Sequence, residues 1–180
     1  APGPDPVPAI QRVLKGYFMA RGGERGELLI LSRHPIVERH EWPLGELSTC
    51  LEAVIDYQGR PIRILNVHFM TGDPKGELRG RGTALPRRVV LSARTRTVQA
   101  EALRDLVLRS PMPTVVTGDF NSPSTSQAYE ILSTVLDDVF GRSGLGVGFT
   151  YSTVRPLWRI DYVWSRSLQP LRARVVNAAV

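Results

Sequence analysis

The chain has 180 residues, enough for one domain whose apolar core needs neither disulfides nor a structural metal. Its apolar fraction of 42% and charged fraction of 22% exclude an intrinsically disordered chain, and no apolar run approaches the ~20 residues that span a membrane. The net charge of +6 favours a polyanionic or phosphate-bearing partner. Cys50 is the one cysteine, so an internal disulfide is excluded and the compartment is not indicated.

The N-terminal half of the chain predicts short strands separated by turns. Residues 1–8 hold four prolines and predict a flexible entry segment. Alternation along 62–69 places His68 on the same face as Ile64 and Asn66, at the end of its strand. That strand and the one before it flank a tight turn, so they predict an antiparallel hairpin. A short helix is expected at 9–15, and strands are expected at 17–20, 28–31, 36–40, 50–57 and 62–69.

The C-terminal half predicts helices as well as strands. The segment 70–88 carries four glycines, one lysine and four arginines, which predicts a solvated loop or, alternatively, a mobile basic rim beside a phosphate site. A second helix is expected to begin at Ser124 or Thr125 and to end near Thr134. The strongest helix is expected at 92–109, with an apolar stripe made of Val98, Ala102, Leu103, Leu106 and Val107. Extended segments are expected at 136–140, 149–153, 159–164 and 171–176.

A strand and a turn meet within residues 114–123. The run Thr-Val-Val at 114–116 is β-branched and predicts a buried strand, and the Gly, Asn, Ser and Pro residues of 118–123 predict the turn that ends it. Because residues i and i+2 of an extended chain face the same way, Asp119 and Asn121 are expected to point together from the strand end. A carboxylate and an amide placed in this way suit the positioning of a water molecule, a metal ion or a phosphate. The alternative is an Asx turn that merely closes the strand.

Two further polar residues lie at unexpected places in strands. Asp161 interrupts the sequence Ile-Asp-Tyr-Val-Trp, where a buried carboxylate is costly without a partner. A solvent-facing edge position is the alternative. His68 ends its strand as Asp119 does, and an ordinary core or surface histidine is the alternative there. His34 and His40 lie in polar turns beside prolines and are assigned to the surface.

Four sequence motifs follow one another in a characteristic order. They are Leu-Ile-Leu-Ser-Arg-His-Pro-Ile at 29–36, Asn-Val-His-Phe at 66–69, Gly-Asp-Phe-Asn at 118–121 and Arg-Ile-Asp-Tyr-Val at 159–163. Together they resemble the endonuclease/exonuclease/phosphatase superfamily, which has the DNase-I-like fold. The resemblance implies an α/β fold, α+β-like in its chain order. It implies a four-layer sandwich of two mainly antiparallel or mixed sheets with helices on the outer faces.

The resemblance also implies metal-dependent hydrolysis of a phosphoester, with Mg²⁺ or Mn²⁺ as cofactor and a water molecule attacking phosphorus. Asp119 then activates the water and is the candidate metal ligand, and Asn121 holds that water or a phosphate oxygen. His68 donates a hydrogen bond to a non-bridging phosphate oxygen. Asp161 orients a catalytic imidazole. The alternative is a catalytically incomplete member of the superfamily that binds phosphate-rich partners such as nucleic acid.

The pattern of the superfamily includes residues that this sequence does not contain. The resemblance implies an Asn and a metal-binding Glu ahead of the motif at 29–36, and neither Glu24 nor Glu27 substitutes for that glutamate. It also implies a Ser-Asp-His motif on a last strand, which is missing after 174–180. We therefore expect residues 1–180 to form a single domain that is incomplete at both ends, and to bind metal and turn over poorly by themselves.

Partners and location follow only from the resemblance. Members of the superfamily cleave DNA, RNA, inositol phosphates or sphingomyelin, so nucleic acid and phospholipid headgroups are both candidate partners. A monomer is expected. Bacterial members of similar composition are often tethered to membranes by upstream segments, so a cytoplasmic and an extracytoplasmic domain of a tethered protein fit equally. In an unrelated α/β domain with chance motifs, His68, Asp119 and Asp161 would lie far apart.

Overall fold

The computed structural model of the chain describes residues 5, 7–24, 26–45, 48–71, 85–151 and 158–176, with the backbone alone for 85–89. None of the helices in these segments is long and apolar enough to cross a membrane. The helices and strands, in chain order, are α1 (Val7–Val13), β1 (Phe18–Gly22), β2 (Leu28–Ser32), β3 (Ile36–Pro43), β4 (Thr49–Tyr57), β5 (Arg60–His68), α2 (Leu85–Leu108), β6 (Thr114–Asp119), α3 (Gln127–Ser133), β7 (Asp137–Asp138), α4 (Val139–Ser143) and β8 (Asp161–Arg166).

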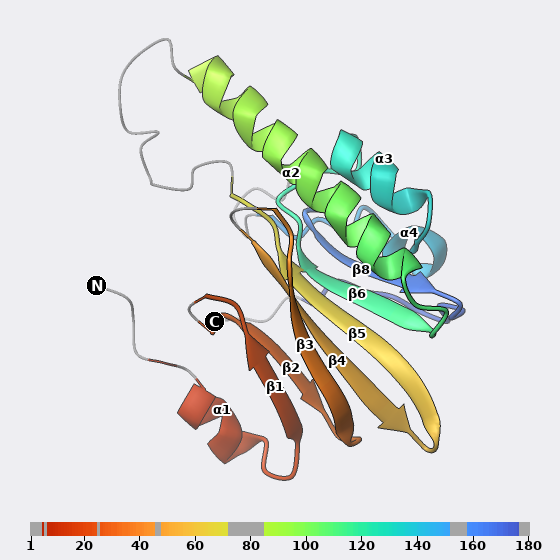
Figure 1. Ribbon diagram of the computed structural model, residues 1–180. Helices are drawn as coiled ribbons and strands as arrows, with labels where there is room; N and C mark the ends of the chain where they lie inside the picture. The colour runs from red at the N-terminus through yellow and green to blue at the C-terminus, as the bar shows by residue number, and fades with distance from the viewer. Residues whose placement is uncertain are drawn as a thin grey trace.

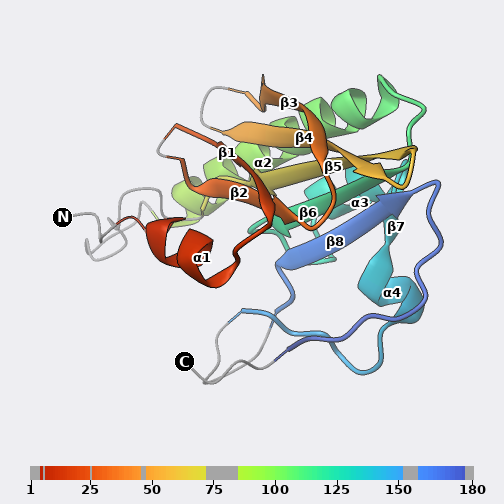
Figure 2. The same cartoon turned by 90° about the horizontal axis from the view of Figure 1, so that it is seen from below.

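A six-stranded sheet in the order β3-β4-β5-β6-β8-β7 forms the centre of the fold. The neighbours β5 and β6 run parallel, and the other neighbouring pairs run antiparallel. The helices α2 and α3 cover one face of this sheet, and the antiparallel pair β1-β2 packs on the other face (Figure 1). The helix α1 lies beside β1 and β2 (Figure 2). The prediction of an α/β sandwich with two sheets and outer helices is therefore confirmed.

Two apolar clusters hold the layers together, since burial of apolar surface is the main stabilising contribution. The larger cluster lies between the six-stranded sheet and the helices α2 and α3, and it includes Leu65, Leu103 and Trp164. Cys50 is fully buried there, as predicted. The smaller cluster joins the two sheets through Ala20, Leu28, Ile30, Leu51 and Ala53.

The strands β4 and β5 form the predicted hairpin. Gln58 and Gly59 close it with φ angles of 56° and 79°, which fit the type I′ turn that matches the twist of paired strands. Along β5, buried and less buried residues alternate, with Leu65 in the larger cluster and Ile64 against the smaller one. The predicted alternation is therefore confirmed, and it leaves His68 exposed at the end of the strand.

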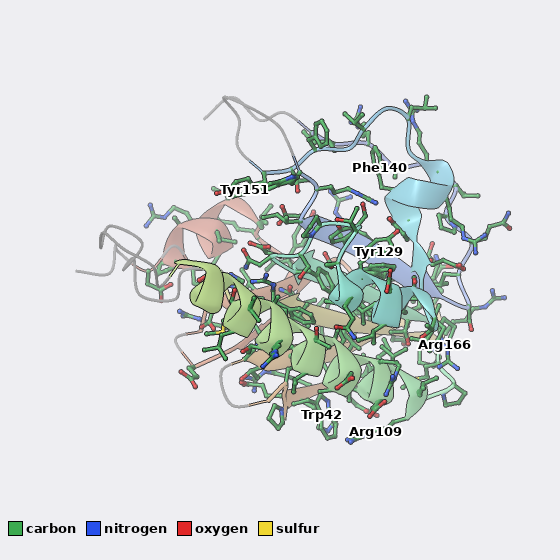
Figure 3. The ribbon with its side chains drawn as sticks, turned by 90° about the horizontal axis from the view of Figure 1, so that it is seen from above. Trp42, Arg109, Tyr129, Phe140, Tyr151 and Arg166 are labelled. Atoms are coloured by element: carbon green, nitrogen blue, oxygen red, sulfur yellow. The ribbon has the colours of Figure 1, made fainter. Side chains whose placement is uncertain are left out.

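The C-terminal end of α2 is held by arginines from two strands. Arg63 of β5 donates to the carbonyl of Leu106 at 2.9 Å. Arg166 of β8 donates to the carbonyls of Val107 at 3.2 Å and Ser110 at 2.9 Å, and Figure 3 shows it beside this end of the helix. Cations there satisfy carbonyls that lack intrahelical partners and complement the helix dipole.

The helix α2 begins at Leu85, well before the expected start at residue 92, so the end of the expected loop is helical. The rest of that loop, 72–84, lies outside the described residues. Val98 was expected to face the core, but it is 53% exposed, because Gln99 and Ala100 occupy the inward positions instead. This small rotation produces a stripe with the usual helical spacing, made of Gln99, Ala100, Leu103, Leu106 and Val107.

Several expected boundaries near the C-terminus are wrong for local reasons. Ser126, and not Ser124 or Thr125, caps α3 by accepting a hydrogen bond from the Tyr129 N–H. The expected extended segment 136–140 is cut short by α4, because Asp138 caps a helix there. The expected strand at 171–176 is absent.

In its place, Ala173 makes one isolated bridge to Gly144. Of the expected strand 149–153, Tyr151 makes one isolated bridge to Trp158, and residues 152 and 153 lie outside the described part of the chain. At the other end of the chain, Val7 and Pro8 begin α1, whereas residues 1–4 and 6 of the expected flexible segment are not among the described residues.

Candidate active site

Three neighbouring strands bring one acid–base side chain each to the same edge of the central sheet. His68, the last residue of β5, pairs in register with Asp119, the last residue of β6. Asp119 pairs in turn with Asp161, the first residue of β8. Because β8 runs antiparallel to β6, its start meets the carboxyl ends of β5 and β6. The three residues therefore form a row, and the hypothesis of an unrelated domain that holds them far apart is wrong.

His68 and Asp119 face each other across the strand ends. The His68 Nε2 atom lies 3.9 Å from Asp119 Oδ2, and the two side chains are 47% and 34% exposed. This distance is too long for a direct hydrogen bond. A water molecule or a substrate oxygen between the two groups can contact both of them.

The surroundings of Asp119 favour its protonated form more than water does. Burial is the main cause of its raised pKa, and the negative charge of Asp161 adds to it. The backbone N–H of Asn121 and the charges of His68 and Arg96 act in the opposite direction. A carboxylate with a raised pKa is a better proton acceptor, which is the property that a general base needs.

The turn after β6 fixes Asn121. Asp119 Oδ1 accepts a hydrogen bond from the Asn121 N–H at 2.8 Å, so the Asx turn considered as an alternative does form. Asn121 has a φ of 48°, in the left-handed region that asparagine tolerates. The chain is no longer extended there, so the argument from strand alternation does not apply to Asn121. Its Nδ2 donates to the carbonyl of Phe69 at 2.9 Å, which leaves the side-chain oxygen as the available polar atom.

Gly118 allows β5 and β6 to approach each other at the site. It has a φ of 145°, and a Cβ atom built on it would lie 1.9 Å from the carbonyl oxygen of Val67. A residue with a side chain would therefore push the two strands apart just before His68 and Asp119. The glycine of the Gly-Asp-Phe-Asn motif is thus required by packing.

Asp161 is exposed, which agrees with the solvent-facing position considered as the alternative and leaves its proposed role as a prediction. The Thr150 hydroxyl holds the start of β8 by accepting from the N–H groups of Ile160 and Asp161, each at 3.1 Å. No ion pair among the described residues joins Asp161 to an imidazole. Its nearest charged neighbour in register is the carboxylate of Asp119.

A comparison with protein families shows which family the chain belongs to. The profile of the Endonuclease/Exonuclease/phosphatase family matches residues 3–180. The chain belongs to this family. The comparison with curated proteins finds no match.

Solved structures of family proteins share the fold. An endonuclease/exonuclease/phosphatase from Bacteroides vulgatus matches with a TM-score of 0.69 and 18% identity, over 89% of this chain and 69% of that one. A family protein from Bacteroides thetaiotaomicron has a TM-score of 0.65 and 18% identity, over 89% and 64% of the two chains. The mannosyl-6-phosphatase of the same species has a TM-score of 0.61 and 19% identity, over 89% and 66%. The chain thus spans about two thirds of the length of these proteins.

The row contains oxygen-rich side chains of the kind that bind divalent metals. Asp119 and Asp161 provide two carboxylates in register. The described residues contain no group of three or more His, Cys, Asp or Glu side chains placed to hold a metal. Mg²⁺ is commonly held by one or two carboxylates together with water and substrate phosphate. The residues present therefore fit an ion shared with the substrate, and they do not form a closed protein cage.

Sequence reasoning missed Arg96 and Gln99 of α2, which hydrogen-bond to Met70 just after the strand end that carries His68. A polar residue between Val98 and Ala100, in the middle of an apolar helix face, was the signal available for Gln99. Arg96 carried no such signal, because arginines on the solvent-facing side of helices are common.

Of the two histidines assigned to the surface, His40 is exposed, whereas His34 is half-buried with its ring 4.7 Å from that of Tyr57.

Proposed function

We propose that the protein hydrolyses phosphoesters in a metal-dependent reaction in which water attacks phosphorus. The row of His68, Asp119 and Asp161 on three adjacent strands is the observation that carries this proposal. Such a reaction needs a base for the water and hydrogen-bond donors for the phosphate oxygens. Membership of the Endonuclease/Exonuclease/phosphatase family and the similarity to a mannosyl-6-phosphatase support it.

Asp119 is the proposed base. Its Oδ1 is engaged by the Asn121 N–H, so Oδ2, which faces His68, takes the proton of the attacking water. The side-chain oxygen of Asn121 accepts the second hydrogen bond of this water, because its Nδ2 is committed to Phe69. Together they orient one lone pair of the water toward phosphorus.

His68 stabilises the charge that grows on phosphate. Its imidazole stands across from Asp119 and donates a hydrogen bond to a non-bridging oxygen as the transition state forms. Asp161 would orient the catalytic imidazole that the family resemblance implies, which none of the described histidines supplies. When bound at Asp119 and Asp161, Mg²⁺ or Mn²⁺ would neutralise phosphate oxygens and aid the leaving group.

The test is hydrolysis by the full-length protein with and without Mg²⁺ or Mn²⁺. Suitable substrates are bis(p-nitrophenyl) phosphate, p-nitrophenyl phosphate and plasmid DNA, which separate diester, monoester and nucleic-acid cleavage. We expect turnover of at least one substrate that chelation by EDTA abolishes. Binding of these compounds without hydrolysis under any of the conditions would overturn the proposal in favour of a phosphate-binding protein.

Replacement of His68 by alanine is expected to lower kcat by roughly 10²–10³-fold, the effect of removing one donor to a developing oxyanion. KM should change much less, because the hydrogen bond strengthens mainly in the transition state. Steady-state kinetics on the best substrate of the panel measure both constants. The exposed His40 on β3 provides the matched control, and His40→Ala should leave both unchanged. If kcat of His68→Ala equals that of the wild type, His68 is an ordinary surface histidine without a catalytic role.

A further inference from the structure

Two side chains of α2 form hydrogen bonds with the segment that follows β5. Gln99 Oε1 accepts a hydrogen bond from the Met70 N–H at 3.0 Å. Arg96 Nη1 donates to the Met70 carbonyl at 3.4 Å. Residues three apart on a helix lie on one face, so Arg96 and Gln99 hold both sides of the same residue. The helix is thereby fixed to the chain two residues after His68.

The same segment is also part of the candidate site. The Phe69 carbonyl accepts the amide of Asn121 at 2.9 Å, and the Phe69 N–H donates to the Asp119 carbonyl at 2.9 Å. Arg96 is therefore joined to the turn that carries Asp119 and Asn121 by a short chain of contacts through Met70 and Phe69. This places a guanidinium at the edge of the sheet where His68 and Asp119 face each other.

The charge of Arg96 acts on the site. Arg96 is half-buried, and its positive charge lowers the pKa of Asp119, in opposition to burial and to Asp161. The described residues include no carboxylate in an ion pair with Arg96, whereas Arg104 of the same helix pairs with Asp105 at 2.8 Å. Five N–H donors make a guanidinium well suited to phosphate oxygens. Its single long contact with Met70 leaves most of this capacity for another acceptor.

Gln99, on the same helix face as Arg96, has a buried side-chain donor without a partner among the described residues. Its side chain is 1% exposed, and its Nε2 has no hydrogen-bond partner among the described residues. Buried donors are almost always paired, so one left unpaired beside a functional site indicates an acceptor from outside these residues.

We propose that Arg96 binds a non-bridging oxygen of the substrate phosphate at the site formed by His68, Asp119 and Asn121. The physical need is clear, because the carboxylates of Asp119 and Asp161 repel an anionic phosphate. A guanidinium beside them offsets this repulsion and lets the phosphate approach the base. This inference rests on the proposed function in that it assumes a phosphate-bearing substrate.

The test measures the affinity of the full-length protein for inorganic phosphate by calorimetric titration at two salt concentrations. In Arg96→Met, phosphate affinity should fall about ten-fold to a hundred-fold, the range for loss of a charge-assisted hydrogen bond. Its dependence on salt should weaken as well, which loss of a structural contact alone would not cause. Arg96→Lys keeps the charge without the forked donors and should lie between wild type and Arg96→Met. If Arg96→Met does not fold, the phosphate affinity of Arg96→Lys still tests the inference.

Arg94→Met is the matched control, because Arg94 is exposed on the same helix two residues away. Equal phosphate affinity in the Arg94 and Arg96 variants would overturn the inference.

Failure of the inference can be told apart from failure of the proposed function, since the titration needs no turnover. A protein that binds phosphate through Arg96 without hydrolysing any ester supports the inference and overturns the function. If the protein hydrolyses esters and both Arg96 variants keep the wild-type phosphate affinity, the proposed function is supported and the inference is overturned. Absence of phosphate binding in the wild type overturns the inference.

Discussion

Asp119→Asn is expected to lower kcat by roughly 10²–10⁴-fold, the contribution of a general base in the transition state. The substitution is nearly isosteric, and the asparagine oxygen can still accept the N–H of Asn121, as Asp119 Oδ1 does at 2.8 Å. The turn and the strand pairing should therefore persist, and only the basic carboxylate is lost. Initial rates on bis(p-nitrophenyl) phosphate measure the effect. Asp105→Asn, on the exposed surface of α2, is the control and should keep full activity.

The same substitution is expected to leave the stability unchanged or to increase it at neutral pH. Burial and the charge of Asp161 raise the pKa of Asp119 above its usual value of 3.8. A carboxyl whose pKa is higher in the folded than in the unfolded state destabilises the fold when it is ionised, and this effect vanishes below the unfolded pKa. Thermal unfolding should thus show Asp119→Asn at or above wild type at pH 7, and equal to it at pH 3. A variant that loses activity and stability together would make Asp119 a structural residue.

Local rules were enough to predict the strand ends that carry His68 and Asp119. The β-branched run at 114–116 and the turn formers after it placed Asp119 at the end of β6. Alternation along β5 placed His68 at the end of that strand. These features depend on residues close in sequence, so the sequence pattern contains them. The order of the four motifs then indicated the family, which the profile match confirms.

The features that the sequence did not predict depend on contacts between distant segments. The parallel pairing of β5 and β6 across α2 puts His68 and Asp119 at one edge, and no local pattern specifies which strands become neighbours. Asp138 interrupts the expected extended segment because it caps α4 and also pairs with Arg159 of the segment before β8. The inward Gln99 is explained by its hydrogen bond to Met70, 29 residues earlier in the chain.

The largest expected loss of stability comes from Arg63→Met, beneath the helix that carries Arg96. Arg63 is 2% exposed and Glu52 is 5% exposed. The Arg63 guanidinium donates to both Glu52 oxygens, at 2.5 and 3.2 Å, and the Trp42 indole N–H also donates to this carboxylate. Arg109 lies over the Trp42 ring with its guanidinium carbon 5.8 Å from the centroid (Figure 3). Removal of Arg63 leaves a buried charge without its cation, which costs about 3–5 kcal/mol of unfolding free energy in urea titrations.

The pH dependence and a second substitution separate the charge effect from lost packing. Burial opposes ionisation of Glu52, but the hydrogen bonds of Arg63 and Trp42 and the Arg63 charge outweigh it, so its pKa lies below the usual 4.5. Such a carboxyl contributes stability above its unfolded pKa and loses it as the pH falls through the folded pKa. The difference between wild type and Arg63→Met should therefore be largest at neutral pH and shrink below about 4.5.

Adding Glu52→Gln removes the unpaired charge and keeps an acceptor for Trp42, so the double variant should regain most of the lost stability. If the double variant is as unstable as Arg63→Met alone, the loss arises from the Leu106 carbonyl that Arg63 no longer holds. The ion pair would then matter less than its role in fastening the end of α2 to the sheet. Since α2 also carries Arg96 and Gln99, phosphate affinity measured in the same variants would show whether that fastening reaches the site.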